Sequence, residues 1–273
     1  MTPLIDASAI LDDLWLKIEF ENPSLSIKHR AIPQRIFDLF DKGIINRETN
    51  VVILTAGSAG ISAAYAACKL GCKAILLVQQ GISNGIVSYA KHLGADVQEY
   101  SHDGLKDALE RYRNDDNNYV IEQLTDTSLV SYYKPIGQEL LKQNHRLSAV
   151  VVGAGTTASL MGISSTVRES GIKIYAVEPE KSAVLSGNKW SPHHIQGLAP
   201  PLPTRLFDSQ QIDGVLTVTE EDAWHEASTA LRLLGQPIGS SSGAVISAAK
   251  KLREDGHAGD IAGICAAHVM TCL

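Results

Sequence analysis

The sequence lacks a long hydrophobic run and a block of basic residues. A membrane helix needs about 18 or more consecutive apolar residues, and no stretch of the 273 residues is that long. The formal net charge is −6, and lysine and arginine are scattered, so no basic face for nucleic acid is indicated. We therefore expect neither a membrane nor a nucleic acid as partner, and we expect chemistry on small molecules.

Cysteine is also scarce. The sequence contains four: Cys68, Cys72, Cys265 and Cys272. They have neither CxxC spacing nor the density of a disulfide scaffold, and the two that lie one helical turn apart would make a poor zinc site. The side chains of the adjacent His193 and His194 diverge and lack further ligands, so we expect no metal. The start of the chain has no signal-peptide pattern, which predicts a cytoplasmic protein with reduced thiols.

Patterns typical of strands and helices alternate along the chain. Apolar runs and period-two alternation predict strands at 14–20, 51–54, 73–78, 95–98, 119–124, 147–152 and 174–179. Apolar residues at helical spacing predict helices at 32–43, 61–70, 86–93, 105–113, 130–141 and 220–234. This alternation is the α/β pattern, and the length allows two modest domains or one large one.

One polar segment near the N-terminus contains a lysine whose amine could point inward. The segment reads Asn22-Pro23-Ser24-Leu25-Ser26-Ile27-Lys28-His29-Arg30. A lysine amine acts as a nucleophile only when uncharged, which requires desolvation or a nearby cation, and the neighbouring leucine and isoleucine could help to desolvate it. From these residues alone, a solvated surface lysine is the commoner alternative, because lysine is rarely buried.

Two turns of small residues each lie between a predicted buried strand and a helix. They are Thr55-Ala56-Gly57-Ser58-Ala59-Gly60 and Gly153-Ala154-Gly155-Thr156-Thr157-Ala158-Ser159. The free amides and the positive dipole end at the start of a helix suit an anion. Many α/β folds use such turns for packing, so the first turn alone leaves its function open. NAD is not indicated, because neither turn has the GxGxxG pattern followed by an acidic residue.

The lysine segment and the two small-residue turns, in their order along the chain, resemble segments of the cysteine synthase and cystathionine β-synthase family. The family lysine motif is N-P-[ST]-x-S-[VI]-K-x-R, and the residues from Asn22 to Arg30 match all seven of its defined positions, the other two being free. Two further segments resemble family motifs: Pro192–Leu198 resembles P-H-x-I-Q-G-[IL], and Gly239–Ala244 resembles G-[IP]-S-S-G-A. The resemblance implies pyridoxal phosphate (PLP) fold type II, which is tryptophan synthase β-like. That fold has two three-layer α/β domains with mostly parallel sheets, here mainly residues 1–125 and 126–273.

The resemblance also assigns site residues. Lys28 would bind PLP and act as the catalytic base. The cofactor phosphate would lie on the second turn, through Gly155, Thr156, Thr157, Ala158 and Ser159. The substrate carboxylate would lie on the first turn and Gln123, through Thr55, Ala56, Gly57, Ser58 and Ala59. Gln123 is equally well explained as a polar cap at a strand end. Ser58 would take the place of an asparagine that contacts the cofactor, and His268 would take the place of a serine at the pyridine nitrogen.

The sequence departs from the family pattern at several of these positions. The first turn reads T-S-G-N-T-G in the family, so Ala56, Ser58 and Ala59 are changes. Two family glycines are replaced by Thr157 and Ala158, and a β-branched residue with positive φ would be strained by about 1–3 kcal/mol. The family segment that closes over the substrate is replaced at 79–87, where only one serine is retained. These changes are expected to alter substrate specificity or binding.

The function implied is PLP-dependent β-replacement. The substrate would be a serine-derived amino acid such as O-acetylserine, which would react through an aminoacrylate intermediate with a sulfur or nitrogen nucleophile. A homodimer is expected from the same resemblance. The alternative is a non-catalytic relative of these enzymes that acts as a binding or partner subunit, because fold alone does not establish function.

Overall fold

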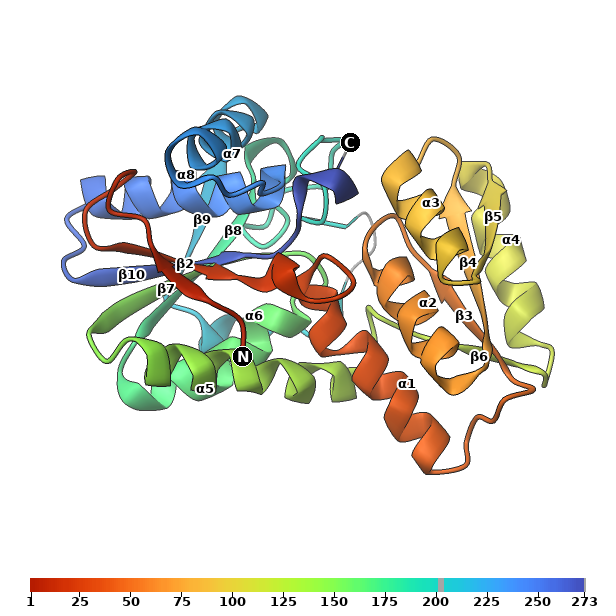
Figure 1. Ribbon diagram of the computed structural model, residues 1–273. Helices are drawn as coiled ribbons and strands as arrows, with labels where there is room; N and C mark the ends of the chain where they lie inside the picture. Colours follow the sequence, from red (N-terminus) through yellow and green to blue (C-terminus); the bar gives the residue numbers. More distant parts are fainter. Residues whose placement is uncertain (201–203, 273) are drawn as a thin grey trace.

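Two β-sheets organise the chain in the computed structural model, which describes residues 1–200 and 204–272 (Figure 1). The strands are β1 (Leu4–Asp6), β2 (Leu14–Ile18), β3 (Asn50–Leu54), β4 (Lys73–Gln79), β5 (Asp96–Tyr100), β6 (Asn118–Val120), β7 (Leu147–Gly153), β8 (Lys173–Pro179), β9 (Gly214–Val218) and β10 (Asp260–Cys265). The α-helices are α1 (Ile32–Asp41), α2 (Ala59–Leu70), α3 (Asn84–His92), α4 (His102–Arg113), α5 (Lys134–Gln143), α6 (Ala158–Val167), α7 (Glu220–Leu234) and α8 (Ser240–Glu254). The larger sheet has the order β1-β2-β10-β7-β8-β9, and the smaller has the order β5-β4-β3-β6.

Both sheets are mostly parallel, which confirms the predicted fold class. Only the pairing of β1 with β2 is antiparallel among the described strands. Parallel neighbours need crossover connections, and helices supply most of them here. The first two strands belong to the larger sheet with β7 to β10, although the residues that follow them build the smaller sheet.

Helices cover both faces of the larger sheet (Figure 1). Alternate residues along β7 point to opposite faces, because the side-chain period of a strand is two. Ala149 and Val151 pack in one core with α7 and α8, whereas Val150 and Val152 pack in another with α5 and α6. That second core continues into the smaller sheet, so apolar packing joins the two halves of the molecule.

The smaller sheet is packed in the same way. Val51 and Ile53 of β3 belong to the core that includes α1 and α2, whereas Val52 packs with α4 on the opposite face. Burial of both faces explains why β3 and β4 are almost uninterrupted runs of apolar residues.

The predicted elements are confirmed in place, although several differ in extent. The strand predicted to begin at Leu14 ends at Ile18, where a short 3-10 turn follows. The strand predicted from Tyr119 is shorter, because the chain turns after Val120. The helix predicted from Val130 begins as a 3-10 turn, and α5 starts only at Lys134. Pro135 in its first turn suits a helix start. None of the described helices has both the length and the hydropathy to cross a bilayer.

Candidate active site

Lys28 lies on a 3-10 turn, Ile27–Arg30, between the exit of β10 and helix α2. Its Nζ atom is 3.3 Å from Oγ1 of Thr156, in the turn that follows β7. Burial lowers the pKa of the Lys28 amine to about 8, and no carboxylate among the described residues pairs with it. A substantial fraction of this amine is therefore uncharged in mildly alkaline solution, which is the form that reacts with a carbonyl.

The backbone around Lys28 is held from both sides. The Ile27 N–H donates to the Ala266 carbonyl at 2.7 Å, directly after β10. The Ser26 hydroxyl accepts from the Lys28 N–H at 3.2 Å. On the other side, the hydroxyl groups of Ser24 and Ser62 are 2.7 Å apart, which ties the segment to α2. The lysine motif thus contacts the end of β10 in the larger sheet and helix α2, which packs on the smaller sheet.

A buried group of charges fixes the end of the lysine motif. The Arg30 guanidinium donates to Glu19 at 2.9 Å and to Glu139 of α5 at 2.7 Å. The fully buried Lys17 donates to Glu139 at 2.6 Å. Burial opposes ionisation of Glu139, but the hydrogen bonds from Arg30 and Lys17 outweigh it and lower the pKa of the carboxyl to about 2. Sequence reasoning missed this cluster, because its members come from three separate segments.

The second small-residue turn presents free amides at the start of α6. Thr157 precedes the helix with φ +65°. The strain expected for a β-branched residue with positive φ therefore applies at this position. No described residue accepts a hydrogen bond from the Thr156 or Thr157 N–H. A Cβ on Gly155 would lie 2.3 Å from the carbonyl oxygen of Gly197, so only glycine fits there. Ala158 and Ser159 form the first residues of α6.

The first small-residue turn is braced by two glutamines. The Gln123 side-chain amide donates to the Leu54 carbonyl at 2.9 Å, at the end of β3. The Gln196 amide donates to the Ala56 carbonyl at 3.1 Å and so reaches the turn from the segment after β8. Gln196 belongs to the P-H-x-I-Q-G motif, which was the signal that sequence reasoning could have used for this contact.

The other residues of this turn lie at the start of α2. The Thr55 hydroxyl accepts from the Gly57 N–H at 3.0 Å. Ser58 occupies the cap position of α2 without making a side-chain cap bond, and Ala59 is the first helical residue. The five residues of this turn that are predicted to bind the substrate carboxylate therefore lie at or just before one helix N-terminus, where the dipole favours an anion.

His268 lies beside the lysine motif. Its backbone N–H donates to the Leu25 carbonyl at 3.1 Å. Its Nδ1 accepts from the Met270 N–H at 3.1 Å, and its ring meets Phe20 edge-on at 5.6 Å. Burial lowers the pKa of the imidazole, so the ring is mainly neutral at pH 7. One ring nitrogen is thus used to cap the short turn Val269–Thr271, and Nε2 remains the nitrogen that could meet a ligand.

The segment that replaces the family closing segment packs on this C-terminal turn. The Ser83 hydroxyl is 3.5 Å from the Met270 carbonyl oxygen, and a Cβ on Gly85 would lie 2.6 Å from the same oxygen. The Tyr89 hydroxyl donates to the Pro23 carbonyl at 2.8 Å. Helix α3 therefore contacts both the turn after β10 and the lysine motif.

These residues fit a phosphate-bearing aldehyde such as PLP. An amine desolvated without a carboxylate partner can attack an aldehyde, and amides without acceptors at the start of α6 can bind a phosphate. The two features meet at the contact between Lys28 and Thr156. The carboxyl ends of parallel strands share one edge, and ligands bind there in open α/β sheets.

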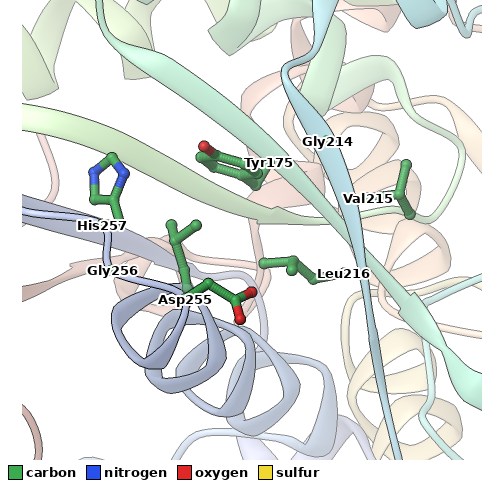
Figure 2. Close-up of a pocket in the computed structure, with 8 residues that line it drawn as sticks. Tyr175, Gly214, Val215, Leu216, Asp255, Gly256 and His257 are labelled. Atoms are coloured by element: carbon green, nitrogen blue, oxygen red, sulfur yellow. The ribbon is translucent and has the colours of Figure 1, made fainter.

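A separate hollow lies near the opposite edge of the larger sheet. Figure 2 shows Tyr175, Leu216 and His257 around it, close to the starts of β8 and β9 and the end of α8. Its volume is about 380 Å³, and the rings of Tyr175 and His257 meet edge-on at 6.2 Å. None of the predicted site residues lines it.

Comparison with known proteins agrees with this geometry. The pyridoxal-phosphate dependent enzyme family matches residues 1–268. The chain is 31% identical to cysteine synthase B of Campylobacter jejuni, over 92% of this chain and 87% of that protein. It is 30% identical to a cysteine synthase of a Flavobacterium species, over 88% and 82%. Among solved structures, the O-acetylserine dependent cystathionine beta-synthase of Helicobacter pylori superposes with a TM-score of 0.86 at 25% identity, covering 98% of this chain and 92% of that one.

Proposed function

Because the chain belongs to the pyridoxal-phosphate dependent enzyme family, we propose that it catalyses β-replacement on a serine-derived amino acid such as O-acetylserine. In this reaction a sulfur or nitrogen nucleophile replaces the leaving group on the β-carbon. The relatives named cysteine synthase and O-acetylserine dependent cystathionine beta-synthase support this class of substrate. The observation that carries the proposal is the desolvated Lys28 amine 3.3 Å from the Thr156 hydroxyl.

PLP, when bound to Lys28, supplies an electron sink for negative charge at the substrate α-carbon. The Lys28 Nζ atom would take the proton from that carbon, and its lowered pKa suits it to act as a base at pH near 8. The Thr156 hydroxyl is the group that would orient this amine. Amides of Thr156 and Thr157, with the α6 dipole, would hold the cofactor phosphate.

The first turn and its braces would bind the substrate carboxylate. Gln123 uses one amide proton on the Leu54 carbonyl and keeps a second for a ligand. Helix α3 and the turn at Val269–Thr271 would limit access of water, because they pack on each other beside the lysine motif. We also propose that the protein is cytoplasmic, which its four unpaired thiols support. We propose that it is a homodimer, which the family resemblance supports.

The test is uptake of PLP by the purified protein. The wild type should gain a visible absorption band and then change its spectrum when O-acetylserine is added. Lys28→Ala should lose the band, whereas Lys106→Ala, on the exposed face of α4, should keep it. A wild-type protein that retains no visible absorption band after excess PLP has been removed would refute the proposal.

A further inference from the structure

Thr157 has a backbone conformation that its own side chain disfavours. Its φ is +65° and its ψ is −6°, directly before α6. A β-branched residue persists in this left-handed region only where its surroundings hold it. Thr157 is 1% exposed, so the contacts that hold it lie inside the protein.

Two hydroxyl groups hold the peptide that joins Thr156 to Thr157. The Thr156 carbonyl oxygen accepts from Oγ1 of Thr204 at 2.8 Å and from Oγ1 of Thr157 at 2.7 Å. These two hydroxyl oxygens are 3.5 Å apart. A carbonyl has two lone pairs, and both are engaged here, so rotation of this peptide would break both hydrogen bonds.

The orientation of this peptide determines where the Thr157 amide points. In a trans peptide the N–H is directed opposite to the carbonyl. Because the Thr156 carbonyl points toward Thr204, the Thr157 N–H points away from it, and no described residue accepts from it. This amide stands at the positive end of α6, where an anion is favoured.

Thr204 is itself anchored beside the smaller sheet. The next residue, Arg205, donates its N–H to the carbonyl of Leu124, which follows β6, at 3.1 Å. The Leu206 N–H donates to the Thr204 hydroxyl at 3.2 Å. That hydroxyl carries one proton, and the 2.8 Å contact to Thr156 takes it in preference to the 3.5 Å approach to Leu124.

We propose that Thr204 is a positioning residue for the cofactor. Its hydroxyl holds the peptide between Thr156 and Thr157 so that the Thr157 amide faces the cofactor phosphate. The inference rests on the proposed function and deepens it, because it assigns a role to a residue outside every motif of the sequence. The side chain of Thr156 contacts the Lys28 amine, so a turned peptide would also displace the partner of that lysine.

The first test compares Thr204→Val, which keeps the shape without the hydroxyl, with Thr204→Ser, which keeps the hydroxyl. Each protein is stripped of cofactor and titrated with PLP, and the ³¹P chemical shift of the bound cofactor is recorded. Thr204→Val should raise the Kd about 5- to 10-fold, the equivalent of one lost hydrogen bond, and should change the shift. Thr204→Ser should stay within about 2-fold of the wild type.

The second test uses Thr157→Gly, because glycine adopts φ +65° without a side-chain penalty. Glycine also lacks the Thr157 hydroxyl, so Thr204 becomes the one described side chain that donates to the Thr156 carbonyl. Adding Thr204→Val to Thr157→Gly should therefore raise the Kd by about 5-fold or more in a double-mutant cycle. If Thr204→Val alone folds poorly, the comparison of Thr157→Gly with and without Thr204→Val still tests the role of Thr204, since the glycine removes the backbone strain. Equal Kd values for the wild type and Thr204→Val, or for Thr157→Gly with and without Thr204→Val, would overturn the inference. A wild type that takes up no PLP would instead overturn the proposed function.

Discussion

The uncharged fraction of one amine should control how fast cofactor binds. The pKa of Lys28 is lowered by burial to about 8 from its ordinary 10.5, and only the uncharged amine attacks an aldehyde. The rate of PLP uptake by cofactor-free protein should therefore rise with pH and level off above about pH 9, with a midpoint near 8. Stopped-flow absorbance measures this rate. A midpoint near the ordinary lysine value would contradict the buried position of the amine.

A second residue-scale prediction concerns the closest backbone approach in the second turn. Gly155→Ala would place a Cβ 2.3 Å from the Gly197 carbonyl oxygen, so the two loops must separate. The free energy of unfolding should fall by about 1–3 kcal/mol, and PLP affinity should fall with it. The measurements are urea unfolding and PLP titration.

The matched control for this variant is Gly57→Ala, in the first turn. The nearest atom to a Cβ there is Nε2 of Gln196 at 4.0 Å, so the free energy of unfolding should change by less than about 0.5 kcal/mol. Equal destabilisation by the two variants would show that the close contact of Gly155 does not matter.

At the scale of elements, the charge cluster joins β2, the lysine turn and α5. Glu139→Gln removes the carboxylate partner of Lys17 and leaves Arg30 with Glu19 alone. Breaking such a buried pair should cost about 3 kcal/mol of unfolding free energy at neutral pH. The folded-state pKa of Glu139 is about 2, below its ordinary 4.5, so this stabilisation is present above pH 4.5 and is lost toward pH 2. Urea unfolding at several pH values measures it.

The control for the cluster is Glu110→Gln, which removes an exposed partner of Arg113. Exposed ion pairs contribute little, so its unfolding free energy should change by less than about 1 kcal/mol. The two variants should also differ in pH dependence. The unfolding free energies of Glu139→Gln and the wild type should converge as the pH falls from 4.5 toward 2. If they do not, the pKa shift is not the source of the stabilisation.

At the scale of the whole molecule, the expected assembly is a homodimer. Sedimentation velocity should give twice the mass of the chain over a wide range of concentrations, with or without PLP. A single species with the mass of one chain would contradict the expected dimer and would leave the active-site geometry, which comes from one chain, unchanged.

Local patterns in the sequence were sufficient for the α/β fold class, because strand and helix periodicities depend on residues close together in the chain. The spacing of the lysine motif and the position of each small-residue turn between a strand and a helix are likewise set by residues close together in the chain. The extents of β6 and α5 were predicted less well, since a turn that begins at Glu122 and a proline at position 135 decide where those elements end and begin.

What only the tertiary structure decided are the properties that arise between distant segments. The lowered pKa of Lys28 comes from burial against a turn 128 residues away, and Glu139 meets Arg30 across 109 residues. The left-handed conformation of Thr157 is held partly by Thr204, which no motif singled out. Sequence periodicity reports which face of an element is buried, whereas desolvation, ion pairing and the orientation of a peptide depend on which other segment covers that face.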